Sequence, residues 1–351
     1  MKTIAIRAER DYEVAFSTDW KSELAVQLQK CAKVGIVISS EMRKRVDLKL
    51  DIPGEVFIFE IPDSEAGKST AILGKLWDWL GAAGFTRSDM IVGIGGGATT
   101  DIAGFAAATW LRGISWVAVP TSIAGAVDAA IGGKTGANSE YGKNLIGAFH
   151  SPNRVIIDLA WFETLSDRDF VAGLAEVIKC GFIKDQRILE ICEGNDLAGI
   201  RKDHALLQEL IERSVQIKAD VVCVDFKDSF EREILNYGHT FGHAVERHSN
   251  YSLRHGECVA IGMVFVAELA KLDGKIDEAL VLRHVALLKK YNLPITYKGG
   301  DWNELLAHMA NDKKSRGSLI RFVVLTGVGS TVRLEGPSSQ LLEQSYERVS
   351  G

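Results

Sequence analysis

Four side chains in the second half of the chain have types and spacing that suit a metal ion. They are Glu176 in AGLAEVIKCG, His239 and His243 in NYGHTFGHA, and His255 in RHGE. Three nitrogen or carboxylate ligands with one open position are the pattern of a catalytic zinc ion. Spacing alone pairs His239 with His243, because residues four apart share one helix face. A single histidine on a helix more often packs against neighbours than binds a metal. The spacing therefore leaves open both a metal site and simple packing.

Polar side chains accompany these four residues in otherwise apolar, helical surroundings. Lys179, Lys218 and Arg232 are basic, and Asn236 lies one turn before His239. Each alone is typical of a solvated helix face. Gathered together, they would bind a charged, hydroxylated substrate through charge-assisted hydrogen bonds.

A glycine-rich run in the first half could bind phosphate groups. The segment Gly93-Ile94-Gly95-Gly96-Gly97-Ala98-Thr99-Thr100-Asp101 follows a predicted strand and opens a predicted helix. Glycines let the backbone approach a pyrophosphate, and the free amides of a helix start attract anions. The spacing is not GxGxxG, so a regular Rossmann fingerprint is absent. The alternative is a tight strand–helix turn, which does not need so many glycines.

A second glycine-rich element, over 128–144, carries Lys134, Asn138, Lys143 and Asn144. It superficially resembles a P-loop, but GxxxxGK[ST] would require glycine where Asp128 stands, which excludes an ATPase of that type. Lysines flanked by glycines beside a helical run still suit a polyanionic ligand.

The elements that must position the first-half residues alternate between strands and helices. Short apolar runs predict buried strands, and helical spacing predicts the helices between them. The predicted strands are 33–38, 55–61, 90–94, 115–119 and 154–158, with helices over 67–82 and 100–111. This alternation favours a Rossmann-like α/β domain with a mostly parallel sheet and helices on both faces.

The second half is predicted to be mainly helical. Helical spacing covers 166–184, 203–224, 232–248, 256–273, 278–291 and 302–311, and a strand pair follows at 319–325 and 331–334. We therefore expect an α/β domain over 1–160 and a mainly helical domain over 161–351, joined tightly. A cleft between two such domains is the default place for a ligand.

Length and composition exclude several classes of protein. The 351 residues exceed the usual size of a single core, and 46% hydrophobic with 25% charged residues excludes wholesale disorder. A net charge of −5 gives no electrostatic case for nucleic acid. Five scattered cysteines without a CxxC pair predict small buried side chains in a reducing compartment. No membrane span and no targeting signal is apparent, so we expect a cytoplasmic protein.

Taken together, the motifs resemble the 3-dehydroquinate synthase family of sugar phosphate cyclases, in its actinobacterial branch. The resemblance extends from about residue 60 to 325 and rests on motifs in the family's order. These are GGGATTDIAGFAAATWLRG, VDAAIGGKTGANSEYGKNLIGAFHSP, AGLAEVIKCGFI, EREILNYGHTFGHA, RHGECVAIGM and DKK.

The resemblance implies a lyase of the shikimate pathway, which leads to the aromatic amino acids. It would convert 3-deoxy-D-arabino-heptulosonate 7-phosphate to 3-dehydroquinate and phosphate. The steps would be transient oxidation by NAD, phosphate elimination, reduction, ring opening and aldol closure. The implied metal is zinc, with cobalt as an alternative, and the implied ligands are Glu176, His239 and His255. The resemblance makes His243 a substrate contact and not a metal ligand. This replaces the pairing of His239 with His243 that spacing favours.

The resemblance also implies contacts to the cofactor and the substrate. NAD would contact Asp63, Ser64, Glu65, Ala66, Gly67, Lys68, Gly97, Ala98, Thr99, Thr100, Asp101, Thr121, Ser122, Lys134, Lys143, Trp161, Phe162, Glu163 and Thr164. Substrate would contact Asp128, Lys134, Asn144, Lys179, Lys218, Arg232, Asn236, His243 and Lys313. Arg112 matches a family arginine that reaches the substrate phosphate across a homodimer interface.

This sequence departs from the family pattern on the cofactor side. Thr100 stands where many members carry glycine, and Ala129, Ala130 and Ser122 replace hydroxyl-bearing or threonine residues. None of these positions is an implied metal ligand.

Three other functions remain as alternatives. The first is a sibling cyclase: amino-dehydroquinate, 2-deoxy-scyllo-inosose or 2-epi-5-epi-valiolone synthase. The second is a metal-dependent polyol dehydrogenase that consumes NAD, which would not need so many phosphate-binding lysines. The third is a non-catalytic binding relative, which would not need Glu176, His239 and His255.

Overall fold

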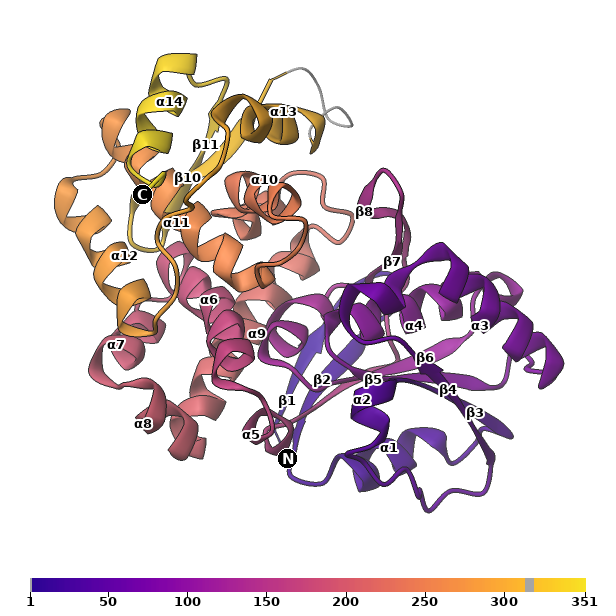
Figure 1. The fold of residues 1–351 in the computed structure, drawn as a ribbon. Coiled ribbons are helices and arrows are strands. Elements are labelled where there is room, and N and C mark those ends of the chain that lie inside the picture. Colours follow the sequence, from indigo (N-terminus) through magenta and orange to yellow (C-terminus); the bar gives the residue numbers. More distant parts are fainter. Residues whose placement is uncertain (1, 313–318) are drawn as a thin grey trace. The chain divides into compact units, whose positions relative to one another are not determined.

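The computed structural model describes residues 2–312 and 319–351, which form two compact units (Figure 1). The first unit comprises Met1–Leu165 with Lys218–Lys227, and the second comprises Ser166–Ile217 with Asp228–Gly351. Helix α9 (His204–Val224) therefore contributes to both units.

The first unit is built on a seven-stranded sheet in the order β1-β2-β9-β6-β5-β3-β4. All neighbours are parallel except β1 and β2, which confirms the prediction of a mostly parallel sheet. The strands are β1 (Lys2–Ile6), β2 (Tyr12–Ser17), β3 (Lys33–Ser39), β4 (Glu55–Ile61), β5 (Met90–Gly95), β6 (Ser115–Pro120) and β9 (Arg154–Asp158). Strands β1 and β2 were not predicted from the sequence.

Helices flank this sheet, with α1 on one side and α3 and α4 on the other (Figure 1). The unit's helices and helical turns are α1 (Trp20–Leu28), α2 (Ser40–Arg43), η1 (Ser64–Lys68), α3 (Thr70–Ala82), α4 (Gly97–Thr109), η2 (Trp110–Arg112), η3 (Gly125–Ala129) and α5 (Ala160–Glu163). The helix predicted over 67–82 divides because Ser69 caps α3, accepting a hydrogen bond from the Ile72 amide.

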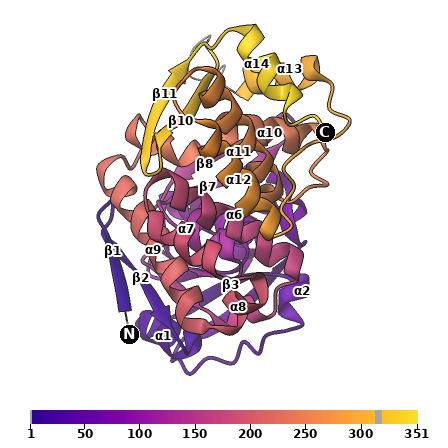
Figure 2. The ribbon, with the colours of Figure 1, turned by 90° about the vertical axis from the view of Figure 1, so that its left-hand side faces the viewer.

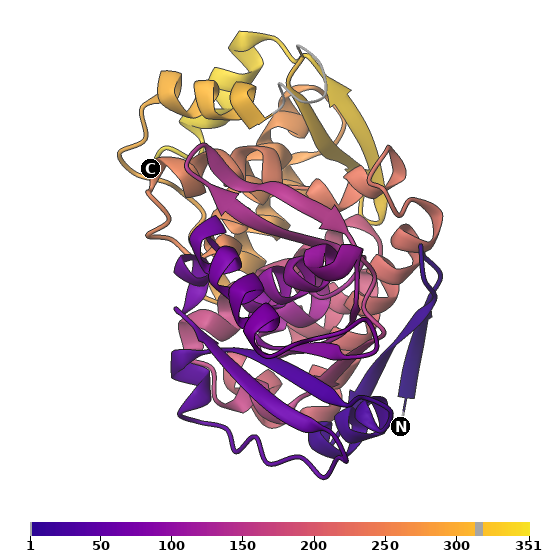
Figure 3. The same ribbon diagram turned by 90° about the vertical axis from the view of Figure 1, so that its right-hand side faces the viewer.

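The second glycine-rich element is a hairpin, and the helical turn η3 (Gly125–Ala129) leads into it. Strands β7 (Lys134–Ser139) and β8 (Gly142–Phe149) pair antiparallel, and β7 contacts α3 and α4 (Figure 3). Gly132 and Gly133 have positive φ values of 90° and 64°, which turn the chain into β7. A P-loop would place a helix there instead.

The second unit is mainly helical, as predicted (Figure 2). Its helices are α6 (Asp167–Ile183), α7 (Gln186–Gly194), α8 (Leu197–Lys202), most of α9, η4 (Glu231–Asn236), α10 (His239–His248), α11 (His255–Leu272), α12 (Glu278–Lys290), α13 (Trp302–Asp312) and α14 (Ser339–Glu347). The predicted strand pair is the antiparallel β10 (Arg321–Gly327) and β11 (Ser330–Glu335).

The helix predicted over 232–248 is interrupted, which corrects that prediction. Tyr237 and Gly238 separate η4 from α10, and Gly238 has a left-handed φ of 77°. Helical spacing on both sides concealed this break.

Two helices form the core of the second unit. Helix α6 is buried from Phe170 to Ile183, and α11 is buried at nearly every position from Gly256 to Ala270. Among the described residues, no helix combines the length and apolar character needed to cross a membrane. Four of the five cysteines are buried, but Cys223 is exposed, contrary to the expectation for all five.

Candidate active site

The second unit brings Glu176, His239 and His255 together. Each offers one ligand atom, and these atoms all lie within 4.8 Å of one another. Glu176 projects from the middle of α6, His239 is the first residue of α10, and His255 is the first of α11. His239 and His243, which the spacing pairs, do not share such a group with Glu176.

The geometry of this group fits a divalent metal ion. Glu176 Oε1 lies 3.6 Å from His239 Nε2 and 3.2 Å from His255 Nε2. Two ligands about 2.1 Å from a tetrahedral ion are roughly 3.4 Å apart, which matches both separations. Glu176 Oε1 is also buried without a hydrogen-bond partner within the described part of the chain. Such an oxygen is costly to bury, and a bound cation would satisfy it in place of the protonated His255 ring that faces it at 3.2 Å in the metal-free protein.

Neighbouring charges set the protonation of this group. Burial alone would raise the pKa of Glu176, but Lys179 and the imidazoles outweigh burial and hold it well below its usual value. Lys179 Nζ donates to Glu176 Oε2 at 2.5 Å. Burial, with help from the Lys179 charge, lowers the pKa of His239 to about 3, so this imidazole is neutral. The ligand set therefore joins an anionic oxygen to a neutral imidazole.

Backbone hydrogen bonding fixes the tautomer of His239. Its Nδ1 lies 3.1 Å from the carbonyl oxygen of Tyr237. A carbonyl only accepts, so Nδ1 carries the proton and Nε2 presents its lone pair toward Glu176. This is the orientation in which a histidine binds a metal.

Glu246 is a nearby carboxylate that the sequence analysis missed. It is buried, and its Oε2 lies 3.5 Å from His255 Nδ1. Burial lowers the pKa of His255, but the carboxylates of Glu176 and Glu246 outweigh it and raise the value to about 10. Glu246 follows His243 by three residues, so both lie on one face of α10, and this spacing could have revealed it.

Glycines let the three supporting helices approach closely. A Cβ on Gly256 would lie 1.7 Å from the carbonyl oxygen of Ala172 in α6. A Cβ on Gly262 would lie 1.9 Å from the carbonyl oxygen of Gly238. These close contacts hold the first turn of α11 against α6, four residues before Glu176, and the middle of α11 against the turn that opens α10.

Other predicted substrate residues of the second unit lie in or beside these elements. Arg232 in η4 is buried, Asn236 ends η4, and His243 is partly exposed with its ring 5.3 Å from that of His239. Lys313 lies outside the described residues.

In the first unit, α4 begins directly after β5, as predicted. A Cβ on Gly95 would lie 2.5 Å from Thr99 Oγ1, so Gly95 serves the close packing of α4 on the strand. A Cβ on Gly96 would find only Ser122, at 3.5 Å or more. The start of α4 also has no side-chain cap. Packing does not require Gly96, and the uncapped amides suit a phosphate group.

A buried lysine connects the predicted cofactor residues. Lys68 is 3% exposed and contacts the carboxylate of Asp101 and the side-chain oxygen of Asn144. Burial raises the pKa of Asp101, although the Lys68 charge opposes that rise. Glu65 accepts a 2.6 Å hydrogen bond from Asn138 and lies 3.4 Å from Lys143 Nζ. These contacts tie η1 to the β7–β8 hairpin.

The remaining predicted residues of the first unit are more scattered. The Lys218 ammonium, on α9, contacts the carboxylate of Asp128. Arg112 is exposed, with a positive φ of 66°.

Phe162 is fully buried, and Trp161 packs against Trp20 with ring centroids 5.3 Å apart. Lys134 is exposed, Thr121 is buried, Asp63 accepts from the Glu41 amide, and Ser122 Oγ accepts from the Gly125 amide.

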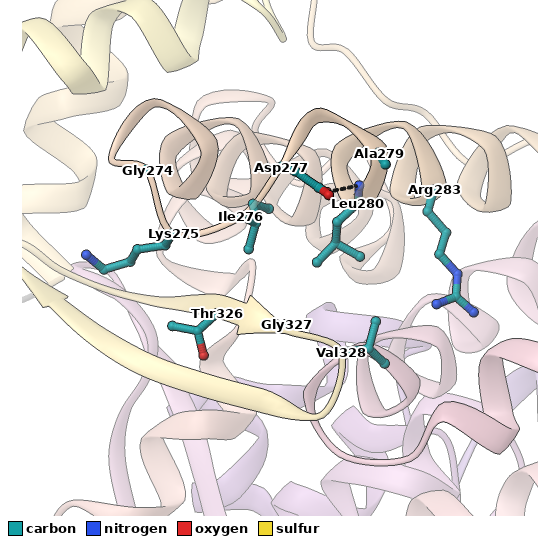
Figure 4. Close-up of a pocket in the computed structure, with 10 residues that line it drawn as sticks. All are labelled: Gly274, Lys275, Ile276, Asp277, Ala279, Leu280, Arg283, Thr326, Gly327 and Val328. Atoms are coloured by element: carbon teal, nitrogen blue, oxygen red, sulfur yellow. Dashed lines mark hydrogen bonds between the residues drawn. The ribbon is translucent and has the colours of Figure 1, made fainter.

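A depression of about 680 Å³ lies elsewhere in the second unit, beside the start of α12 and the β10–β11 turn (Figure 4). Its lining contains none of the predicted site residues. It is lined by Gly274, Lys275, Ile276, Asp277, Ala279, Leu280, Arg283, Thr326, Gly327 and Val328.

Comparison with known proteins decides the family. The model of the 3-dehydroquinate synthase N-terminal domain matches residues 58–172, and that of the C-terminal domain matches residues 173–315. The chain belongs to the 3-dehydroquinate synthase family. A 3-dehydroquinate synthase of Corynebacterium diphtheriae is 46% identical over 355 aligned positions, covering 99% of each chain. One from Thermobifida fusca is 54% identical over 297, covering 85% of this chain and 81% of the relative.

Solved structures agree on the fold of this family member. The 2-epi-5-epi-valiolone synthase of Streptomyces hygroscopicus, with NAD⁺ and Zn²⁺ bound, has a TM-score of 0.91 at 26% identity, covering 99% of both chains. This 26% identity is far below the 46% and 54% identity to the two 3-dehydroquinate synthases. The difference favours 3-dehydroquinate synthase over 2-epi-5-epi-valiolone synthase.

Proposed function

We propose that the chain is a 3-dehydroquinate synthase that converts 3-deoxy-D-arabino-heptulosonate 7-phosphate to 3-dehydroquinate and phosphate. The observation that carries the proposal is the buried Glu176 oxygen facing two imidazole nitrogens, in a chain of this family. Such a group supports a metal-dependent reaction and has no use in a non-catalytic binding protein.

We assign a divalent metal ion, zinc first and cobalt second, to Glu176, His239 and His255 in the second unit. The oxygen and nitrogen donors suit either ion. We assign NAD to the first unit, at the start of α4 and the η1 segment. When bound, the metal supplies Lewis-acid polarisation of a substrate hydroxyl, and NAD supplies a reversible hydride acceptor.

The protein's own side chains prepare these sites. The Lys179 ammonium keeps the Glu176 carboxylate ionised, and the Tyr237 carbonyl holds the proton of His239 on Nδ1. We assign Arg232, Asn236, His243 and Lys179 of the second unit, and Asp128, Lys134, Asn144 and Lys218 of the first, to the substrate. Their cationic and amide groups bind the phosphate and carboxylate and stabilise oxyanions that develop as phosphate leaves.

We also propose a cytoplasmic homodimer in which Arg112 reaches the substrate phosphate of the other subunit. Five free cysteines suit a reducing compartment. The exposed Arg112 follows Leu111, which also has a positive φ, of 50°. Consecutive strained residues favour a functional role for this turn.

Glu176→Gln tests the metal assignment, with Glu268→Gln as its matched control. Both residues are buried glutamates on core helices, but Glu268 pairs with Lys271 and lies 13 residues beyond His255 along α11. We expect Glu176→Gln to lose bound zinc and to slow phosphate release from the heptulosonate phosphate by a factor of about 10³ or more. We expect Glu268→Gln to retain both. Equal zinc content and phosphate release in the two variants would contradict the assignment.

A further inference from the structure

A buried hydrogen bond joins the turn before α10 to helix α12. Tyr237 and His284 are each fully buried, and the Tyr237 hydroxyl lies 3.0 Å from His284 Nε2. Neither residue belongs to the predicted site. Tyr237 lies within the motif EREILNYGHTFGHA, but the resemblance gives it no role there, and the proposed reaction does not use the pair.

The surroundings of His284 determine which atom donates. His284 Nδ1 lies 2.7 Å from the carbonyl oxygen of Leu280, so Nδ1 carries a proton. Burial lowers the pKa of His284 to about 4, which keeps the ring neutral and leaves a lone pair on Nε2. The Tyr237 hydroxyl must then donate to Nε2.

The His284 ring is held on its face as well as its edges. It stacks on Phe182 with a centroid distance of 3.5 Å and an interplanar angle of 9°. Leu280 is itself fixed, because its amide donates to Asp277 Oδ1 at 3.0 Å (Figure 4). His284 therefore presents a rigid acceptor to Tyr237.

Tyr237 passes this constraint to a metal ligand through its backbone. Its carbonyl accepts from His239 Nδ1, and only Gly238 separates the two residues. Gly238 is left-handed, and α10 begins without a side-chain cap. The direction of the carbonyl thus depends on where the Tyr237 side chain is anchored.

We propose that Tyr237 and His284 are positioning residues that aim His239 at the metal. The inference rests on the proposed metal site and extends it by two residues that contact neither metal nor substrate. Removing the hydroxyl should loosen the Tyr237 carbonyl and let the His239 ring turn. Metal affinity should then fall, as it does in metal sites when a group that hydrogen-bonds to a metal ligand is removed.

The test compares Tyr237→Phe with Tyr291→Phe. Tyr291 is also fully buried in the second unit, and its hydroxyl lies 2.7 Å from the carbonyl oxygens of both Cys192 and Asn195, which share its one proton. Each variant loses one buried hydroxyl. Zinc affinity is measured by chelator competition, and the visible spectrum of the Co²⁺ form reports ligand geometry. We expect Tyr237→Phe to bind zinc about tenfold more weakly, with an altered Co²⁺ spectrum, and Tyr291→Phe to match the wild type.

A double variant separates positioning from simple stability. Tyr237→Phe/His284→Leu removes both polar partners, so no unsatisfied nitrogen remains to destabilise the fold. We expect the melting temperature to recover toward the wild-type value while zinc affinity stays low. Recovery of both together, or unchanged zinc affinity in Tyr237→Phe, would overturn the proposal. A wild-type protein that binds no zinc or cobalt would instead overturn the underlying metal site.

Discussion

At the scale of single residues, the site depends on charges that are buried in pairs. Glu176 is 1% exposed and Lys179 is 2% exposed, so neither would remain ionised there alone. Their hydrogen bond keeps the carboxylate anionic before any metal arrives. The proposed metal ligands are thus preorganised by a positive charge that is not itself one of them.

Metal binding should depend on pH through His255. In the metal-free protein its raised pKa of about 10 keeps the imidazole charged at pH 7. This protonation stabilises the metal-free fold fully below the unfolded value of 6.5, and the benefit disappears as pH rises through about 10. A metal ligand must be neutral, so binding expels the proton.

Zinc affinity should therefore rise about tenfold per pH unit between pH 7 and 9, as expected for the release of one proton. Titration calorimetry at pH 7 in buffers of different ionisation enthalpy measures that release. A zinc affinity that is flat with pH, with no proton released, would contradict this assignment.

Gly96 and Gly95 should behave differently when changed to alanine. A Cβ on Gly96 makes only an ordinary contact with Ser122 at 3.5 Å, whereas a Cβ on Gly95 meets the Thr99 side chain at 2.5 Å. We expect Gly96→Ala to keep the wild-type melting temperature but to weaken NAD⁺ binding by about tenfold, because the methyl group blocks a phosphate. Gly95→Ala should lose about 1–3 kcal/mol of stability. Calorimetry and thermal denaturation measure the two effects, and unchanged NAD⁺ affinity in Gly96→Ala would count against the phosphate site.

At the scale of elements, the proposed metal site of Glu176, His239 and His255 depends on how closely α11 approaches α6. Gly256→Ala would force its Cβ against the Ala172 carbonyl, 1.7 Å away, and push His255 away from Glu176. We expect a loss of about 2–3 kcal/mol in unfolding free energy and at least a tenfold loss of zinc affinity. Gly74→Ala in α3 is the control, because its Cβ meets nothing within 4 Å. Full zinc affinity in Gly256→Ala would contradict this role.

The sequence predicted five of the seven strands of the large sheet from short apolar runs. Strands such as β5 are apolar at successive positions and bounded by turn residues, so local pattern suffices. Strands β7 and β8 were missed because glycines and polar residues interrupt them, and their pairing is fixed by the turn at Gly132 and Gly133. The break at Gly238 was missed because helical spacing continues across it.

The candidate metal site was predictable from the sequence only in part. Residue types and spacing indicated a metal site among Glu176, His239, His243 and His255 but paired His239 with His243, and only the family resemblance moved His243 out of the ligand set. Tyr237 and His284 meet through a contact between segments 47 residues apart in the chain. No local pattern indicates such contacts.

At the scale of the whole molecule, Arg112 tests whether the two subunits of the proposed homodimer share their sites. If Arg112 acts in trans, Arg112→Ala and Glu176→Gln proteins should each be inactive but should complement when refolded together. A mixed dimer would then hold one site with both an intact metal group and the partner's arginine. Random mixing should restore about a quarter of wild-type phosphate release, as half the dimers are mixed and one site in each is intact. No restoration despite mixed dimers would contradict a shared site.

The most direct test of the proposed function counts the phosphate released per NAD. Metal-stripped protein is supplied with zinc, the heptulosonate 7-phosphate, and NAD⁺ far below the substrate concentration, and the product is identified by its mass. We predict many phosphates per NAD⁺, no accumulation of NADH, and 3-dehydroquinate as the product. Accumulation of NADH without phosphate release would contradict the account and indicate a dehydrogenase that consumes NAD⁺.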